Sequence, residues 1–142
     1  MGQWGVKSYE GDDAADALDA AFGRVHGATY DDLMDDRNPL TFDQVQQQLA
    51  NPETLAAAVG ALEAEFGGDL DAWDEEERLA FAGALVRHAE AGVPIPEPWR
   101  ARALDWLDRE AIDWEEATAR RLRRQKEIAL LMRSGPAGDG GP

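Results

Sequence analysis

Four aspartates close together in the sequence are the residues best suited to bind a hard metal ion. Their i and i+4 members would share one face of a helix, and they are Asp31, Asp32, Asp35 and Asp36. Carboxylate oxygens are preferred ligands of Mg²⁺ and Ca²⁺, and a larger site would include Asp12, Asp13 and Asp16. Runs of like charge are more often a solvated surface. We therefore predict an acidic binding face, with no metal ligand and no catalytic residue.

Other catalytic chemistry has little support in the sequence. The chain has two serines, Ser8 and Ser134, and neither lies in a nucleophile-elbow motif. Neither His26 nor His88 has the Glu three residues earlier that di-iron helices need. We expect His88 to be half-buried or on the surface, and His26 to stabilise a helix end. The sequence predicts no cofactor and does not favour an enzyme.

A second charged group lies near the C-terminus and is basic. Helical periodicity groups Ile128, Ala129 and Met132 on one side and directs Arg120, Arg123 and Lys126 largely away from it. A basic amphipathic helix suits a membrane, a nucleic acid or an acidic protein groove. We expect pairing within the chain or with a second copy, because acidic surface is nearest there. The expected basic residues are Arg120, Arg121, Arg123 and Arg124.

The whole of the net charge of −15 lies in the first eighty residues. Up to Ala80 there are nineteen acidic and four basic residues, and from Phe81 onward there are ten of each. Such a surface repels nucleic acid and anionic lipid, so we expect neither to bind the acidic half. A basic protein is the expected partner, because opposite charge accelerates association.

The composition describes a chain able to form a core without cross-links. With no Cys there is no disulfide and no thiolate metal site, while 44% hydrophobic residues and five Trp supply core area. The longest apolar run considered, Ile128 to Met132, is five residues, too short for a bilayer span. The opening residues lack the apolar stretch of a secretory signal. We expect a cytoplasmic protein that does not bind membranes.

Helix-forming residues dominate, and no Val-, Ile- or Thr-rich alternating run is present. Residues from Asp12 to about Gly27 read as a first helix, followed by a short helical turn over 31–36. Thr41 to Gln44 forms a capping box, and Asn51-Pro52 starts the next helix. A further helix is expected from about Asp74 to Gly92.

The C-terminal part admits two interpretations. The VPIPEP segment at 93–98 reads as an extended loop inside one domain. A helix follows, and a capping box at 113–116 favours a separate last helix ending near Arg133, although one helix from Glu97 to Arg133 is the alternative. We predict an all-α fold: a compact orthogonal bundle of about five to six helices within 1–133, with an extended N-terminal segment and a disordered tail at 134–142.

The opening residues carry a recognisable pattern of glycine, aromatic and acidic positions: Gly2, Trp4, Gly5, Tyr9, Glu10, Asp12, Asp13, Ala14 and Asp16. This pattern resembles the bacterial family called domain of unknown function 4259, whose members commonly open with Met-Gly-x-Trp-Gly. Ala17 stands where such proteins often carry Trp. The resemblance covers roughly the first twenty residues and implies a small bacterial intracellular protein, with no activity to carry over. We expect Trp4 and Tyr9 to pack on the helices.

Together these features predict a non-enzymatic protein-interaction module, such as an inhibitor or immunity-type binder of a basic partner. A carboxylate–metal-dependent hydrolase using the aspartate cluster is one alternative. A helical scaffold that forms homo-oligomers through its C-terminal helix is another.

Overall fold

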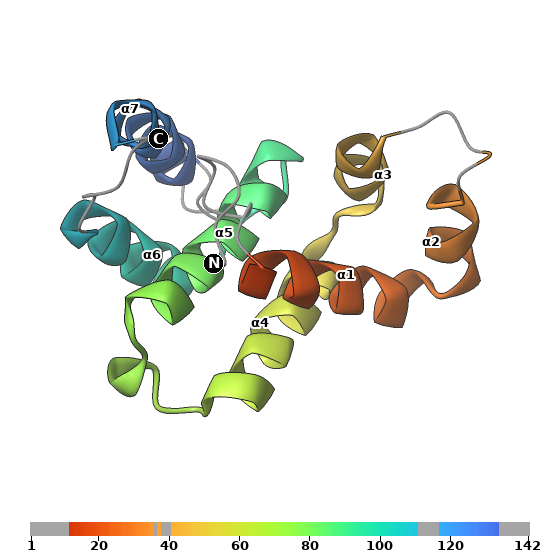
Figure 1. Ribbon diagram of the computed structural model, residues 1–142, viewed down its shortest axis with the longest axis horizontal. Coiled ribbons are helices and arrows are strands. Elements are labelled where there is room, and N and C mark those ends of the chain that lie inside the picture. The colour runs from red at the N-terminus through yellow and green to blue at the C-terminus, as the bar shows by residue number, and fades with distance from the viewer. Residues whose placement is uncertain (1–11, 36, 38–40, 111–116, 134–142) are drawn as a thin grey trace.

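The regular structure of the described residues is entirely helical (Figure 1). The computed structural model describes residues 12–35, 37, 41–110 and 117–133. Along these residues the elements are α1 (Asp12–His26), α2 (Ala28–Leu33), α3 (Phe42–Leu49), α4 (Pro52–Phe66), the 3₁₀ turn η2 (Leu70–Ala72), α5 (Glu75–Glu90), α6 (Glu97–Arg109) and α7 (Ala117–Arg133). The predicted all-α fold is confirmed. The helix beyond the five to six expected is the six-residue α2, which lies where the sequence predicts a helical turn.

The helix starts follow from local side-chain chemistry. Thr41 caps α3, because its Oγ1 accepts a hydrogen bond from the Gln44 backbone N–H at 3.1 Å while the Gln44 side chain accepts from the Thr41 N–H. Asn51 caps α4 in the same reciprocal way, with Pro52 in the first turn. Both predicted starts are confirmed. Asp74 caps α5 through a third capping box.

The second helix begins three residues earlier than the sequence predicts. Gly27 has a φ of 54°, which ends α1 and allows α2 to begin at Ala28. Tyr30 then packs inward, with its ring 5.7 Å from that of Phe22. Because α2 ends at Leu33, Asp35 lies past its end. The expectation that Asp31 and Asp35 share a helix face is therefore wrong.

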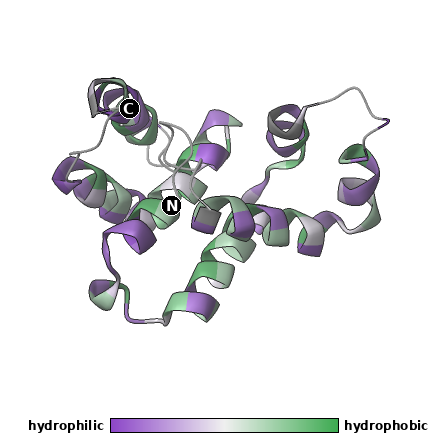
Figure 2. Cartoon of the chain, viewed as in Figure 1, coloured by the Kyte–Doolittle hydropathy of each residue, from purple (hydrophilic) through white to green (hydrophobic). Residues whose placement is uncertain are grey.

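Helix α5 is the centre of the bundle. Its residues from Ala80 to Ala89 are all buried, and it packs against α1 and α4 on one flank and α6 and α7 on the other. Figure 2 shows hydrophobic residues frequent along α4 and hydrophilic ones frequent along α7. The inner helices are therefore held by apolar burial, which is the main stabilising contribution in folding.

The C-terminal part consists of two helices, so the interpretation of one continuous helix from Glu97 to Arg133 is wrong. Helices α6 and α7 pack against each other and against α5. The segment before α6 is extended, and its Val93 and Ile95 side chains are buried. These two residues help to fix α6 on α5 by removing apolar surface from water.

Several predicted features lie outside the described residues. They are the N-terminal segment with Trp4 and Tyr9, residue Asp36, the capping box at 113–116 and the tail at 134–142. Within the described part of the chain, no helix has both the length and the apolarity that a bilayer crossing requires.

Candidate functional site

The acidic face lies on and just after α2. Asp31, Asp32 and Asp35 are exposed, and Asp36 lies outside the described residues. The Arg37 guanidinium binds Asp35 in bidentate fashion, with Nε and Nη2 each 3.0 Å from a carboxylate oxygen. These hydrogen bonds hold the pKa of the Asp35 carboxyl below its ordinary value. Asp31 and Asp32 present their carboxylates to solvent.

The larger cation site suggested by the N-terminal aspartates is not formed by the described residues. Among them, no three acidic or histidine side chains come close enough to hold one metal ion. Asp19 of α1 instead accepts a hydrogen bond from the Tyr30 hydroxyl at 2.8 Å. The acidic side chains of this region therefore bind protein groups or face solvent separately.

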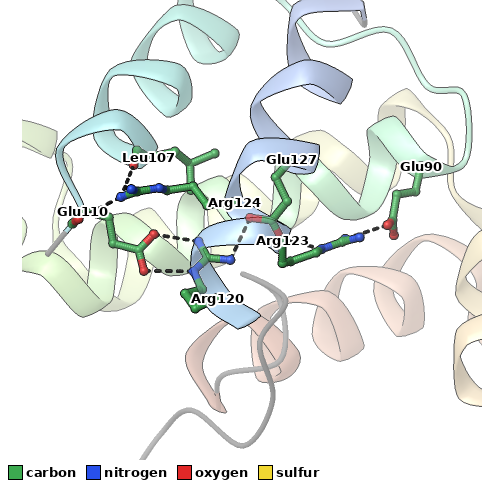
Figure 3. A network of polar contacts seen from close by, with 7 residues as sticks. All are labelled: Glu90, Leu107, Glu110, Arg120, Arg123, Arg124 and Glu127. Atoms are coloured by element: carbon green, nitrogen blue, oxygen red, sulfur yellow. Dashed lines mark hydrogen bonds and ion pairs between the residues drawn. The ribbon is translucent and has the colours of Figure 1, made fainter. Parts of the chain in front are cut away.

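Arg120 and Arg123 of α7 form a network of buried and part-buried ion pairs with glutamates, drawn in Figure 3. Arg120 is completely buried, and its Nε and Nη2 lie 3.0 and 2.7 Å from the two carboxylate oxygens of Glu110. Its Nη1 lies 3.0 Å from Glu127 Oε1. Burial lowers the pKa of Arg120, but the hydrogen bonds and charges of Glu110 and Glu127 outweigh it and raise that pKa overall. The guanidinium is therefore fully charged in the interior.

Arg123 continues the network toward α5. Its Nε lies 3.1 Å from Glu127 Oε2, and its Nη2 lies 2.6 Å from Glu90 Oε2. Glu127 is completely buried and binds both arginines. We call this set the α7 charge network and define it as Glu90, Glu110, Arg120, Arg123 and Glu127.

Two further arginines join α6 and α7 through backbone carbonyls. Arg124 Nη1 donates to the carbonyl oxygens of Leu107 and Glu110, at 3.2 and 2.9 Å, at the C-terminal end of α6. In the opposite direction, Arg100 Nη1 donates to those of Leu131 and Met132 near the end of α7, at 3.4 and 3.2 Å. Each guanidinium thus binds carbonyls at the negative end of the other helix.

The structure directs Arg120 and Arg123 inward, whereas Lys126 is exposed as predicted. Arg120 is buried and Arg123 largely so, whereas Met132 is 63% exposed and Leu122 is 60% exposed. The expected outward orientation of Arg120 and Arg123 is therefore wrong; Arg121 is exposed. The physical reason is that Glu90 and Glu110 compensate the guanidinium charges. One signal was visible in the sequence: Glu127 is the single acid in a basic stretch and lies two helical turns after Arg120.

A series of polar contacts connects the α7 charge network to the acidic half. Arg87 Nη1 lies 3.8 Å from Glu90 Oε1, and Arg87 Nε donates to Gln46 Oε1 at 3.2 Å. The Gln46 amide donates to the Tyr30 hydroxyl at 3.4 Å, and Tyr30 donates to Asp19. Burial is the main cause that raises the pKa of Tyr30 to about 12. Helical periodicity in the sequence does not identify this series of polar contacts, because its residues come from four different helices.

The two histidines have structural positions. His26 Nε2 lies 2.7 Å from the Leu49 carbonyl oxygen, which joins α1 to α3. His88 is completely buried, so the expectation of a half-buried or surface histidine is wrong. Its Nδ1 lies 2.8 Å from the Ala84 carbonyl oxygen and its Nε2 2.8 Å from Thr54 Oγ1. Burial lowers the pKa of His88 to about 4.

The pair of Thr54 and His88 has the atoms of a nucleophile and a base but not their accessibility. Both side chains are completely buried. Thr54 also completes the capping box of α4 with Asn51. The contact therefore lies in the packed interior and joins α4 to α5.

A shallow pocket of about 100 Å³ lies between α5 and α6 beside Trp106. The guanidinium carbons of Arg78 and Arg102 lie 5.4 and 5.5 Å from the Trp106 ring centroid, which are cation–π distances. The pocket is smaller than the roughly 300 Å³ of a typical small-molecule site. We therefore assign Trp106, with Arg78 and Arg102 against its ring, to packing between α5 and α6.

Comparison with known proteins finds no match: no family model, no curated protein and no solved structure is similar to the chain. The resemblance of the opening residues to domain of unknown function 4259 stays a prediction. The candidate sites are therefore the acidic face and the α7 charge network, and they rest on geometry and charge.

Proposed function

We propose that this protein is a non-enzymatic interaction module whose acidic face binds a basic protein. One observation carries the proposal: the ion pairs described for Arg120 and Arg123 of α7 are made with acids outside the acidic half. Arg120 and Arg123 bind Glu90, Glu110 and Glu127, all of which follow residue 80. Arg102 of α6 pairs with Asp71. The exposed carboxylates of Asp16, Asp31 and Asp32 belong to the excess of nineteen acids over four bases in the first eighty residues, and we assign them to a partner.

The distribution of this charge suits recognition more than catalysis. Asp16, Asp31 and Asp32 are exposed on α1 and α2. An extended field of one sign accelerates encounter with an oppositely charged protein and depends on ionic strength. The hydrolase alternative requires converging carboxylates, and in the described part of the chain it has no such support.

The test is binding of a fluorescent nona-arginine peptide measured by anisotropy. Asp31→Asn/Asp32→Asn should weaken binding at least threefold, and affinity should fall steeply between about 50 and 500 mM salt, because exposed charges are screened. The matched control is Glu53→Gln/Glu65→Gln, which removes two exposed charges from α4. The proposal is wrong if the two double variants weaken binding equally, or if affinity does not depend on salt.

A further inference from the structure

We infer that α7 occupies a seat on α5 and α6 that also accepts an arginine-bearing amphipathic helix from the basic partner, so that α7 is an internal competitor. We define the α7 seat as the carboxylates of Glu90 and Glu110 with the carbonyl oxygens of Leu107 and Glu110. This inference rests on the proposed function, and it specifies where the basic partner binds and that the bound segment is a helix.

The carboxylates and carbonyls of the seat are all acceptors, and α7 supplies each with a guanidinium donor, while Arg100 of α6 donates in the other direction to the Leu131 and Met132 carbonyls. Glu110 accepts two hydrogen bonds from Arg120, and Glu90 accepts one from Arg123. The two carbonyls at the end of α6 accept from Arg124. Bidentate and planar contacts of this kind select arginine over lysine. The seat is thus specific for arginines at positions i, i+3 and i+4 of a helix.

The way α7 is held makes it exchangeable. Its described residues that are completely buried are Arg120, Glu127 and Leu131, so two of the three are charged. Desolvation offsets much of the attraction within a buried ion pair, so such contacts give specificity more than stability. When α7 leaves, Glu90 and Glu110 regain water as ordinary carboxylates, and the seat is not left with a buried charge.

The contrast with α5 supports release of α7 as a unit. Helix α5 buries ten consecutive residues against neighbours on both flanks. Among the described helices, α7 makes its main contacts with α5 and α6, where Leu131 is buried and Ile128 and Leu130 are partly buried. Helices with few buried apolar contacts open at lower free energy than the core. A partner helix that supplies the same arginines then meets a seat already shaped for it.

The test uses a fluorescent peptide of residues 117–133 as the probe and the full chain as the receptor. Arg120→Gln/Arg123→Gln in the full chain weakens the internal competitor, so the peptide should bind this variant at least tenfold more tightly than the wild type. Lys126→Gln removes an exposed positive charge of the same helix and is the matched control. Adding Glu90→Gln/Glu110→Gln to the first variant should reduce peptide affinity by at least tenfold.

Equal peptide affinity for wild type and Arg120→Gln/Arg123→Gln would overturn the inference. So would binding that is lost with Asp31→Asn/Asp32→Asn but kept with Glu90→Gln/Glu110→Gln, which would place the peptide on the acidic face and leave the proposed function standing. Concentration-dependent dimers of the wild type, seen by light scattering in place of peptide binding, would also overturn it in favour of α7 exchange between copies.

A measurement on the wild type keeps the inference testable if the variants fail to fold. Hydrogen exchange should show α7 amides exchanging at least tenfold faster than those of α5. Equal protection of α7 and α5 would overturn the inference, because a competitor must leave the seat without global unfolding.

Discussion

Arg120 places a full positive charge in the interior, where an unpaired guanidinium is very costly. The cost is offset because Glu110 and Glu127 surround it at hydrogen-bond distance. The same geometry makes each member dependent on the others, since removing one leaves buried charge without compensation. At this scale, the behaviour of a residue follows from its partners and not from its own type.

Arg120→Met should destabilise the protein by about 3–5 kcal/mol, because buried Glu110 then loses its bidentate partner and buried Glu127 loses one of its two guanidinium partners. Urea denaturation followed by circular dichroism measures the loss. The double variant Arg120→Met/Glu127→Leu removes both charges and should recover part of it. Lys126→Met, on the exposed side of α7, should change stability little. A loss below about 1 kcal/mol for Arg120→Met would contradict this account.

His88 should make stability depend on pH in mildly acidic solution. Its folded pKa of about 4 lies below the unfolded value of 6.5, so the unfolded chain binds the proton first. The stability contribution is complete above about pH 6.5 and is lost as the pH falls toward 4, by on the order of 3 kcal/mol. Urea unfolding at several pH values should show a smaller dependence in His88→Leu than in the wild type. Identical slopes would mean that His88 is solvated.

At the scale of elements, two helices show what local sequence does and does not determine. The capping boxes of Thr41 and Asn51 lie within four residues, so the starts of α3 and α4 are predictable. The rotation of α7 is not, because it depends on Glu90 and Glu110, which lie 33 and 10 residues from their arginines. In the sequence, Glu127 is the one indication of the α7 charge network, because a single acid within a basic stretch favours an inward orientation of the surrounding arginines.

Substitution of two glycines, one in a turn and one inside a helix, tests how local backbone conformation determines the helices. Gly27→Ala should destabilise by about 1–3 kcal/mol, because φ of 54° at the junction of α1 and α2 is strained for any side chain. Gly60→Ala, in the interior of α4 where an added Cβ meets nothing within 4 Å, should stabilise by about 1 kcal/mol through helix propensity. Thermal unfolding of both variants measures the two changes in stability. Shifts of the same sign would contradict the assignment of Gly27 to a required turn.

At the scale of the whole molecule, charge and packing are organised separately. The acidic half has exposed carboxylates around a core formed by α1, α4 and α5, while the residues from Phe81 onward carry equal numbers of acids and bases and include most of the α7 arginine–glutamate ion pairs. The excess of acids was readable from composition, and so was the all-α fold. The sequence alone did not show which arginine and lysine side chains could neutralise this excess of acids, because that depends on the inward orientation of Arg120 and Arg123 in α7.

Self-repulsion of the acidic half should make the protein more stable as salt is added. Exposed like charges destabilise the compact state and are screened within about 10 Å at 0.1 M salt, whereas the buried α7 charge network is screened much less. The midpoint of thermal unfolding should therefore rise between about 10 and 200 mM NaCl. Asp31→Lys/Asp32→Lys reduces the net charge and should raise the midpoint at low salt and flatten its salt dependence. If salt instead lowered the wild-type midpoint, exposed ion pairs such as Arg37 with Asp35 would outweigh the repulsion, and the acidic half would be neutralised within the chain itself.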